Sequence, residues 1–187
     1  MMGISSATAE RVLVDTQKKI PETAVTNDGV MGGLSRGQVI VKDGKDERVL
    51  LFSGVLSLEN QGGFSSWVIL DEKVDLSMAD GIKLSVKGDG RTYKMRLATD
   101  EKYRFSRVSF QAPFETRKGK WTDVLVSFSD LKASWRGRKL ERPFEASKVS
   151  RVGIILADGK AGEFQLELKK MQAVQIQRKR SAAENLP

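Results

Sequence analysis

"GIKLSVKGDGRTYKMRL", residues 81–97, decides the fold class of this chain. Two runs in which every second residue is apolar, from Ile82 to Val86 and from Tyr93 to Leu97, flank a Gly-Asp-Gly turn. Such alternation predicts strands that turn one face to a core and the other to water. Because glycine accepts the positive φ of tight turns, the two runs are expected to form a β-hairpin.

The same alternation recurs along most of the chain outward from this stretch. Glycine-rich turns separate the runs, and helical turns are expected only at 76–80, 128–132 and 145–149. Many short strands without a long helix predict an all-β, single-domain β-sandwich of jelly-roll type with about eight to ten strands. The further strands are expected at 38–42, 48–58, 64–70, 104–111, 124–128, 150–156 and 164–169.

The composition argues against an enzyme. A chain of 187 residues with 40% hydrophobic and 30% charged residues suits one soluble globular domain. It contains no cysteine and no histidine, which excludes disulfides and thiolate metal sites and removes the commonest general base. Carboxylates such as Asp123 and Asp130 show no spacing typical of an acid–base pair. We therefore expect no catalytic residues, no metal site and no cofactor.

The net charge of +8 is unevenly placed, because residues after position 100 hold 19 Lys+Arg against 10 Asp+Glu. Such a surplus suits an acidic protein, anionic lipid or nucleic acid, and a merely solvated basic face is the alternative. No apolar run is long enough to span a membrane, and the first residues do not resemble a secretory signal. We expect a cytoplasmic protein with peripheral membrane contact as an option, or a mitochondrial-matrix protein if a presequence has been removed.

"NDGVMGGLS", residues 27–35, is the first candidate binding loop. It is not a phosphate-binding loop, because no lysine follows its glycines and a strand, not a helix, comes next. A structural turn and a binding loop both remain open. We expect Asp28 to accept hydrogen bonds from backbone amides of the loop and Met31 to anchor the loop on the sandwich. Gly32 and Gly33 would allow positive φ or close backbone approach.

Other candidate residues lie at three places. Asn60 belongs to the turn "ENQGGFSS" (59–66), and Arg91 begins the strand after the Gly-Asp-Gly turn. In "SWRGR" (134–138), an aromatic ring lies between two guanidiniums, which suits contact with an anion, protein or sugar. The alternative is a tryptophan that covers one end of the sandwich beside salt-bridged arginines. The candidate partner- or ligand-binding residues are Asn27, Asp28, Met31, Gly32, Gly33, Asn60, Arg91, Trp135, Arg136 and Arg138.

Five blocks in their order resemble the complex I intermediate-associated protein 30 family over roughly residues 25–176. The resemblance implies a galactose-binding-like β-sandwich. Mitochondrial members of the family assist assembly of respiratory complex I, and a plastid relative supports photosystem II biogenesis. The blocks are "NDGVMGGLS" (27–35), "FSGVLSLENQGGFSS" (52–66), "DGIKLSVKGDGRTYKMRL" (80–97), "WTDVLVSFSDLKASWRGR" (121–138) and "VGIILADGKAGEFQLELKKM" (152–171).

The resemblance implies a non-enzymatic, chaperone-like binding module. Its partners would be protein subunits of a membrane respiratory or photosynthetic complex, with weak contact to anionic membrane surfaces. The alternative is a carbohydrate- or small-ligand-binding module. Nucleic-acid binding ranks last, because no recognised motif accompanies the basic, aromatic stretch at 102–110. The expected organisation is a first strand or extended segment at 1–24, the sandwich at 25–176 and a basic flexible tail at 177–187.

Overall fold

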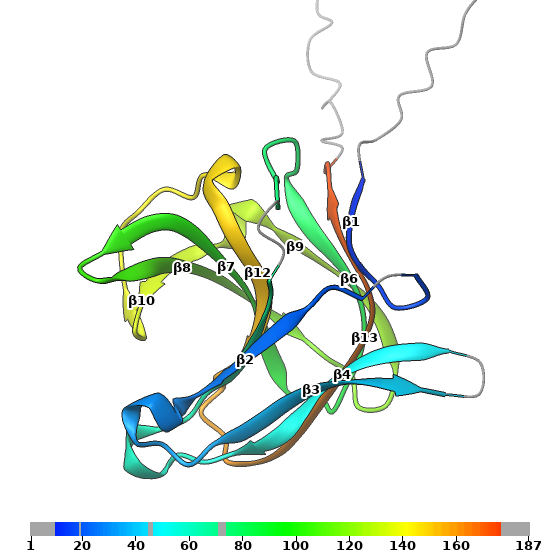
Figure 1. The fold of residues 1–187 in the computed structure, drawn as a ribbon, viewed down its shortest axis with the longest axis vertical. Coiled ribbons are helices and arrows are strands. Elements are labelled where there is room, and N and C mark those ends of the chain that lie inside the picture. The colour runs from blue at the N-terminus through cyan, green and yellow to red at the C-terminus, as the bar shows by residue number, and fades with distance from the viewer. Residues whose placement is uncertain (1–9, 19, 45–46, 71–73, 177–187) are drawn as a thin grey trace, which may run out of the picture.

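Two antiparallel sheets pack face to face in the computed structural model, which describes residues 10–18, 20–44, 47–70 and 74–176 (Figure 1). The six-stranded sheet contains β1 (Arg11–Asp15), β3 (Arg36–Asp43), β4 (Arg48–Leu56), β6 (Gly81–Gly88), β9 (Trp121–Ser127) and β13 (Gly162–Val174). The seven-stranded sheet contains β2 (Thr23–Asn27), β5 (Ser65–Ile69), β7 (Thr92–Tyr103), β8 (Ser106–Glu115), β10 (Lys132–Trp135), β11 (Arg138–Lys139) and β12 (Val149–Leu156).

The core lies between the two sheets and is built from the apolar faces that the alternation predicts. The six-stranded sheet runs in the order β3-β4-β13-β6-β9, with β1 beside β13, and the other in the order β11-β10-β8-β7-β12-β5-β2. Phe52 packs edge-on against Phe164 at 4.9 Å between ring centres, and against Tyr93 of the opposite sheet at 6.4 Å. Aromatic pairs of this kind add to the burial of apolar area. The all-β sandwich expected from the sequence is confirmed.

The described residues form more strands than expected, thirteen in place of eight to ten. Part of the excess comes from β1 and β2, which pair with β13 and β5, and part from the short strands β10 and β11. In the part of the chain that the structure describes, helix is limited to 3-10 turns, η1 (Asp28–Met31), η2 (Glu59–Gln61), η3 (Phe128–Asp130) and η4 (Ala146–Lys148). The expected tail at 177–187 lies outside the described residues.

The predicted hairpin at 81–97 is wrong. β6 pairs with β13 and β9 in one sheet, whereas β7 pairs with β8 and β12 in the other. Both edges of β6 are already occupied, so the chain crosses between the sheets at the Gly-Asp-Gly turn, where Gly90 has φ +93°. The Asp89 carboxylate stabilises this crossing, because it accepts hydrogen bonds from the backbone N–H of Gln165 (2.8 Å) and the Tyr93 hydroxyl (3.0 Å).

Candidate functional site

Asp28 joins two loops at one end of the sandwich. Its side chain is fully buried, and its carboxylate accepts hydrogen bonds from the backbone N–H (2.9 Å) and hydroxyl (2.5 Å) of Ser35. The same carboxylate accepts from the backbone N–H of Gly63 (2.6 Å) and of Phe64 (3.2 Å). Loop 27–35 and loop 57–64, called here the loop pair, are therefore held together by one carboxylate. Hydrogen bonds to a charged group are stronger than neutral ones.

Burial alone raises the pKa of the Asp28 carboxyl group. The four hydrogen bonds from Ser35, Gly63 and Phe64 outweigh burial, so the pKa lies below its ordinary value of 3.8. The carboxyl group is therefore ionised near neutral pH, and the loop pair supplies the hydrogen-bond donors that stabilise its negative charge. The expectation that Asp28 bonds to backbone amides of its own loop is confirmed, and the sequence missed the donors from the second loop.

One glycine from each loop makes room for this carboxylate. A Cβ atom on Gly33 would collide with the side chain of Asp28, and one on Gly62 would lie 2.6 Å from its Oδ2 atom. Gly32 ends η1 with φ +89°, in the left-handed region that favours glycine. The glycine-rich loop thus encloses a carboxylate of its own chain.

Two asparagines complete the loop pair. The Asn27 side chain accepts hydrogen bonds from the backbone N–H of Gly37 in β3 (3.1 Å) and the hydroxyl of Ser65 in β5 (2.7 Å), which links the two sheets. The Asn60 side-chain amide donates to the carbonyl oxygen of Gly32 at 3.1 Å. Asn60 itself has φ 54°, a conformation that asparagine tolerates better than most residues. The loop pair is thus a fixed structure.

The loop pair presents four apolar side chains to solvent. Val30 is 78% exposed, Met31 52%, Leu34 51% and Leu58 46%. The expectation that Met31 anchors the loop is wrong, because the buried anchor is Asp28 and the methionine points outward. We call these four residues the apolar rim. Exposed apolar patches on a soluble protein mark interaction surfaces when they are contiguous.

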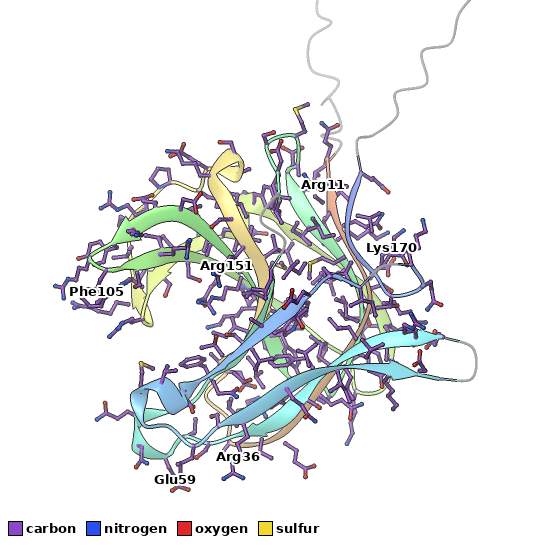
Figure 2. All side chains as sticks on the ribbon, in the orientation of Figure 1. Arg11, Arg36, Glu59, Phe105, Arg151 and Lys170 are labelled. Atoms are coloured by element: carbon purple, nitrogen blue, oxygen red, sulfur yellow. The ribbon has the colours of Figure 1, made fainter. Side chains whose placement is uncertain are left out.

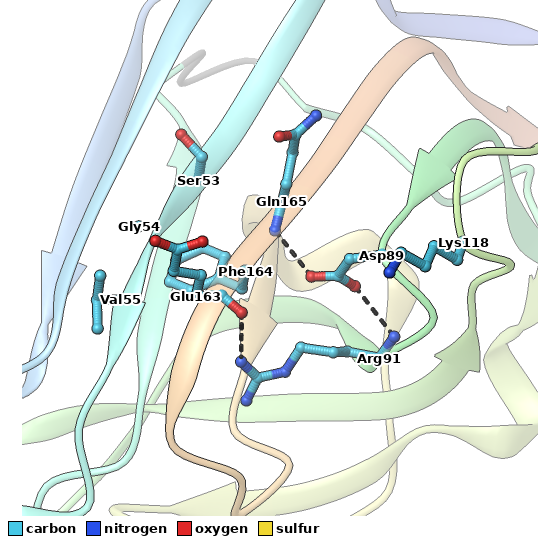
Figure 3. Close-up of a pocket in the computed structure, with 9 residues that line it drawn as sticks. All are labelled: Ser53, Gly54, Val55, Asp89, Arg91, Lys118, Glu163, Phe164 and Gln165. Atoms are coloured by element: carbon cyan, nitrogen blue, oxygen red, sulfur yellow. Dashed lines mark hydrogen bonds between the residues drawn. The ribbon is translucent and has the colours of Figure 1, made fainter.

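Arg91 lies elsewhere, at the crossing between the sheets. Its guanidinium forms a bidentate ion pair with Asp158 (3.0 and 2.7 Å) and donates to the carbonyl oxygens of Lys160, Gly162 and Glu163. The hydrogen bond that Arg91 donates to the Asp158 carboxylate raises the pKa of Arg91. Arg91 and these partners, called here the Arg91 clamp, border a pocket of about 570 Å³ between β4, β13 and the crossing (Figure 3). Groups of the same chain accept the hydrogen bonds of the Arg91 guanidinium, so Arg91 is placed to hold the 158–163 turn in position.

Trp135, Arg136 and Arg138 lie at a third place, the β10–β11 hairpin. Trp135 ends β10 and is 7% exposed, and its indole N–H donates to the Ser106 hydroxyl at 2.7 Å. The ring packs edge-on against Tyr103 (5.4 Å) and Phe105 (6.0 Å) of the β7–β8 hairpin. Trp135 therefore packs at the junction of the two hairpins, and the expectation of a tryptophan that covers one end of the sandwich beside salt-bridged arginines is not met.

The arginines around this ring form no salt bridge with any residue that the structure describes. Arg136 lies over the rings of Phe105 (5.1 Å) and Trp135 (5.5 Å), and Arg104 lies over Trp135 (5.3 Å). Phe105 is 70% exposed at the tip of its hairpin (Figure 2). Arg138 is exposed in β11. Of the ten candidate residues, Asn27, Asp28, Met31, Gly32, Gly33 and Asn60 come together in the loop pair, and the other four do not.

The described residues contain no cluster of three or more acidic, histidine or cysteine side chains that could hold a metal ion. Across the same residues, no helix has the length and apolar character needed to cross a membrane.

Comparison with known proteins was made on sequence and on structure. A sequence model of the family described as Complex I intermediate-associated protein 30 matches residues 12–168. Two proteins named probable complex I intermediate-associated protein 30, mitochondrial, from Caenorhabditis elegans and Caenorhabditis briggsae, are each 31% identical over 133 residues. The alignment covers 69% of this chain and 38% of each relative, so the chain spans well under half of their length.

Solved structures with a similar fold include carbohydrate-binding modules. The family 11 module of a Clostridium thermocellum cellulase superposes with a TM-score of 0.71 at 13% identity, covering 93% of this chain and 99% of the module. A family 30 module superposes with a TM-score of 0.60 at 9% identity, covering 94% and 93%. At such identities the likeness establishes the fold alone.

Proposed function

This chain belongs to the complex I intermediate-associated protein 30 family, and we propose that it is a non-catalytic binding module that assists assembly of respiratory complex I or a related membrane complex through protein–protein contact. The observation that carries the proposal is the loop pair, which holds four exposed apolar side chains on a frame fixed by a buried carboxylate. The family relationship supplies the kind of partner, namely subunits of the complex.

The geometry of the loop pair suits this role. Binding is weakened when loops must become ordered at the interface, and the hydrogen bonds of Asp28, Asn27 and Asn60 fix these loops beforehand. An apolar rim on a fixed frame can pack against subunit surfaces that are still uncovered before assembly is complete. Both relatives carry the word mitochondrial in their names, and we propose that this chain acts peripherally at the membrane where its complex is assembled.

Carbohydrate binding is the second candidate, favoured by the modules that share the fold. Protein modules that bind sugars commonly stack them on exposed aromatic rings, and this chain offers few. Trp67 is 1% exposed and Trp135 7%, and Trp121 is partly buried beneath Lys169, whose ammonium lies 3.9 Å from the ring centre. We therefore rank protein binding first.

Depletion of the chain from its cell of origin tests the proposed function. If it assists assembly, native gels should show less mature respiratory complex and an accumulation of partial assemblies, and the parent chain should restore the complex. Normal amounts of every membrane respiratory and photosynthetic complex in depleted cells would contradict the proposal.

A further inference from the structure

The outer face of the seven-stranded sheet carries an unusual arrangement of charge. Strand pairing places its residues in three rows across the sheet. The rows are Thr26–Ser66–Ile155–Lys94–Pro113, Ala24–Val68–Gly153–Arg96–Gln111–Lys132 and Arg151–Ala98–Ser109–Ser134–Lys139. Every charged residue in these rows is a cation, and the nearest acidic residue in strand register is the exposed Glu115, two positions beyond Pro113. The sequence predicts Lys94 and Arg96 to face outward, but it does not show that β10, β11 and β12 add further cations beside them.

Arg96 lies at the centre of this face and is paired only with neutral groups. Its guanidinium donates to the hydroxyls of Ser66 (3.0 Å) and Ser109 (3.2 Å), which are themselves 1% and 7% exposed. Burial lowers the pKa of Arg96, and the neighbouring charge of Arg151 lowers it further. Among the described residues, neither arginine forms an ion pair. A partly buried guanidinium beside a second cation is costly unless an anion joins them.

On the outer face of the six-stranded sheet, by contrast, lysines are paired with carboxylates. On its outer side Lys87 pairs with Glu167 at 2.6 Å, Lys83 with Asp123 at 3.2 Å, and Lys169 with Glu47. The seven-stranded sheet has ion pairs too, Lys139 with Glu141 at 3.1 Å and Arg107 with Asp100 at 3.6 Å, but these lie at the β10–β11 and β7–β8 hairpins. At the centre of its outer face, Arg96 and Arg151 pair with no carboxylate of the described residues.

The shape of this face restricts what can occupy it. Figure 1 shows that the seven-stranded sheet curves, with β8 and β10 toward one end and β2 toward the other, so that its outer face is concave. Figure 2 labels Arg151 beside β12 on this side and Phe105 at the far tip of the β7–β8 hairpin. A flat bilayer would meet the ends of the sheet before it reached Arg96. The rows contain no aromatic residue on which bases or sugar rings could stack.

We infer that this concave face binds an extended acidic segment of a partner polypeptide, whose carboxylates pair with Arg96 and Arg151. An extended peptide is narrow enough to follow a curved sheet, and carboxylates accept bidentate hydrogen bonds from guanidinium groups. Lys94 and Lys132 would hold further carboxylates as point charges. The inference rests on the proposed protein-binding function and adds to it the chemistry of the partner.

A fluorescein-labelled peptide of ten glutamates is a direct probe of this site, with the full chain titrated against it and anisotropy measured. We expect saturable binding that weakens steeply as salt is raised, because the contacts are ionic. Arg96→Gln and Arg151→Glu should each weaken binding on the order of tenfold, since each removes a charge-assisted contact. Arg151 is exposed, so Arg151→Glu is informative even if Arg96→Gln disturbs folding. Lys42→Glu is the control, with the same charge change on β3 of the opposite sheet.

Three results would overturn the inference. The first is the absence of saturable peptide binding, or a loss of peptide affinity in Lys42→Glu equal to that in the arginine variants. The second is binding to vesicles that contain phosphatidylserine, or to a ten-nucleotide single-stranded RNA, without binding to the peptide. The third is salt-insensitive binding of a neutral mixed-linked glucan on the same face. Peptide binding that persists when depleted cells assemble their complexes normally would contradict the proposed function and leave this site standing.

Discussion

The Asp28 carboxylate accepts a hydrogen bond of 2.6 Å from the backbone N–H of Gly63, 35 residues further along the chain. This contact explains why the two glycine-rich stretches of the sequence belong together. One supplies a buried anion and the other supplies amide donors for it. The apolar rim rests on the frame that results.

Asp28→Ala should lower the free energy of unfolding by about 3 kcal/mol, because it leaves several amide and hydroxyl donors without an acceptor. The sequence alone suggests about 1 kcal/mol, since it does not reveal the donors of the second loop. Urea unfolding measures the difference. Asp43→Ala is the matched control, because Asp43 is exposed and its pair with Arg48 lies on the surface. An equal, small loss in both variants would show that the Asp28 network contributes little.

Three glycine substitutions in the same loop should differ in a fixed order. Gly33→Ala should cost about 2 to 3 kcal/mol, because the added methyl group collides with Asp28. Gly32→Ala should cost about 1 kcal/mol from its positive φ, since the space beside it is open. Gly29→Ala should leave stability unchanged or slightly raised, because Gly29 has neither a positive φ nor a near neighbour. Thermal unfolding ranks the three, and any other order would contradict the packing described.

Acid should weaken the loop pair through Asp28. Because the folded-state pKa of Asp28 lies below its ordinary value of 3.8, its contribution to stability is complete above that value. The contribution is lost as pH falls from about 4 through the folded-state pKa. The difference in unfolding free energy between the parent and Asp28→Asn should therefore be constant near neutrality and shrink below pH 4. A difference that stays the same down to pH 2 would mean that the carboxylate is not the group that stabilises the loops.

The Arg91 clamp should behave as a partly buried ion pair. Arg91→Met should cost about 3 to 5 kcal/mol, because it leaves the partly buried Asp158 carboxylate without its cation and several carbonyl oxygens without the guanidinium donor. The double variant Arg91→Met, Asp158→Leu should lose less than the sum of the single variants. Additive losses would show that the two side chains do not act as a pair.

Much of the fold follows from the sequence, and the pairing of its strands does not. The alternation from Ile82 to Val86 and from Tyr93 to Leu97 places both runs in strands with the correct inner faces. Whether the turn between them closes a hairpin or crosses to the other sheet depends on β13 and β9, which occupy both edges of β6. These partners lie far away in the sequence, and no local pattern reveals them.

The candidate site was predictable to a similar degree. The glycines and Asp28 stand out in the sequence, but an apolar residue was the natural choice of anchor, and Met31 is instead half exposed. The partner loop supplies donors from its backbone, which carries no sequence signal apart from the glycines. The alternation predicts that Arg96 faces outward. Its place at the centre of a cationic face depends on strands β5, β8 and β12, which bring Ser66, Ser109 and Arg151 beside it.

Capture of partners by a tagged chain from gently solubilised membranes tests the central claim most directly. The parent should recover subunits of the respiratory complex, and Met31→Asp should recover several-fold less while it unfolds at the same temperature, because Met31 is exposed and only the contact is lost. Met78→Asp, at a methionine outside the loop pair that is 68% exposed against 52% for Met31, should recover as much as the parent. Undiminished recovery by Met31→Asp, or an equal loss in Met78→Asp, would contradict a partner contact at the loop pair.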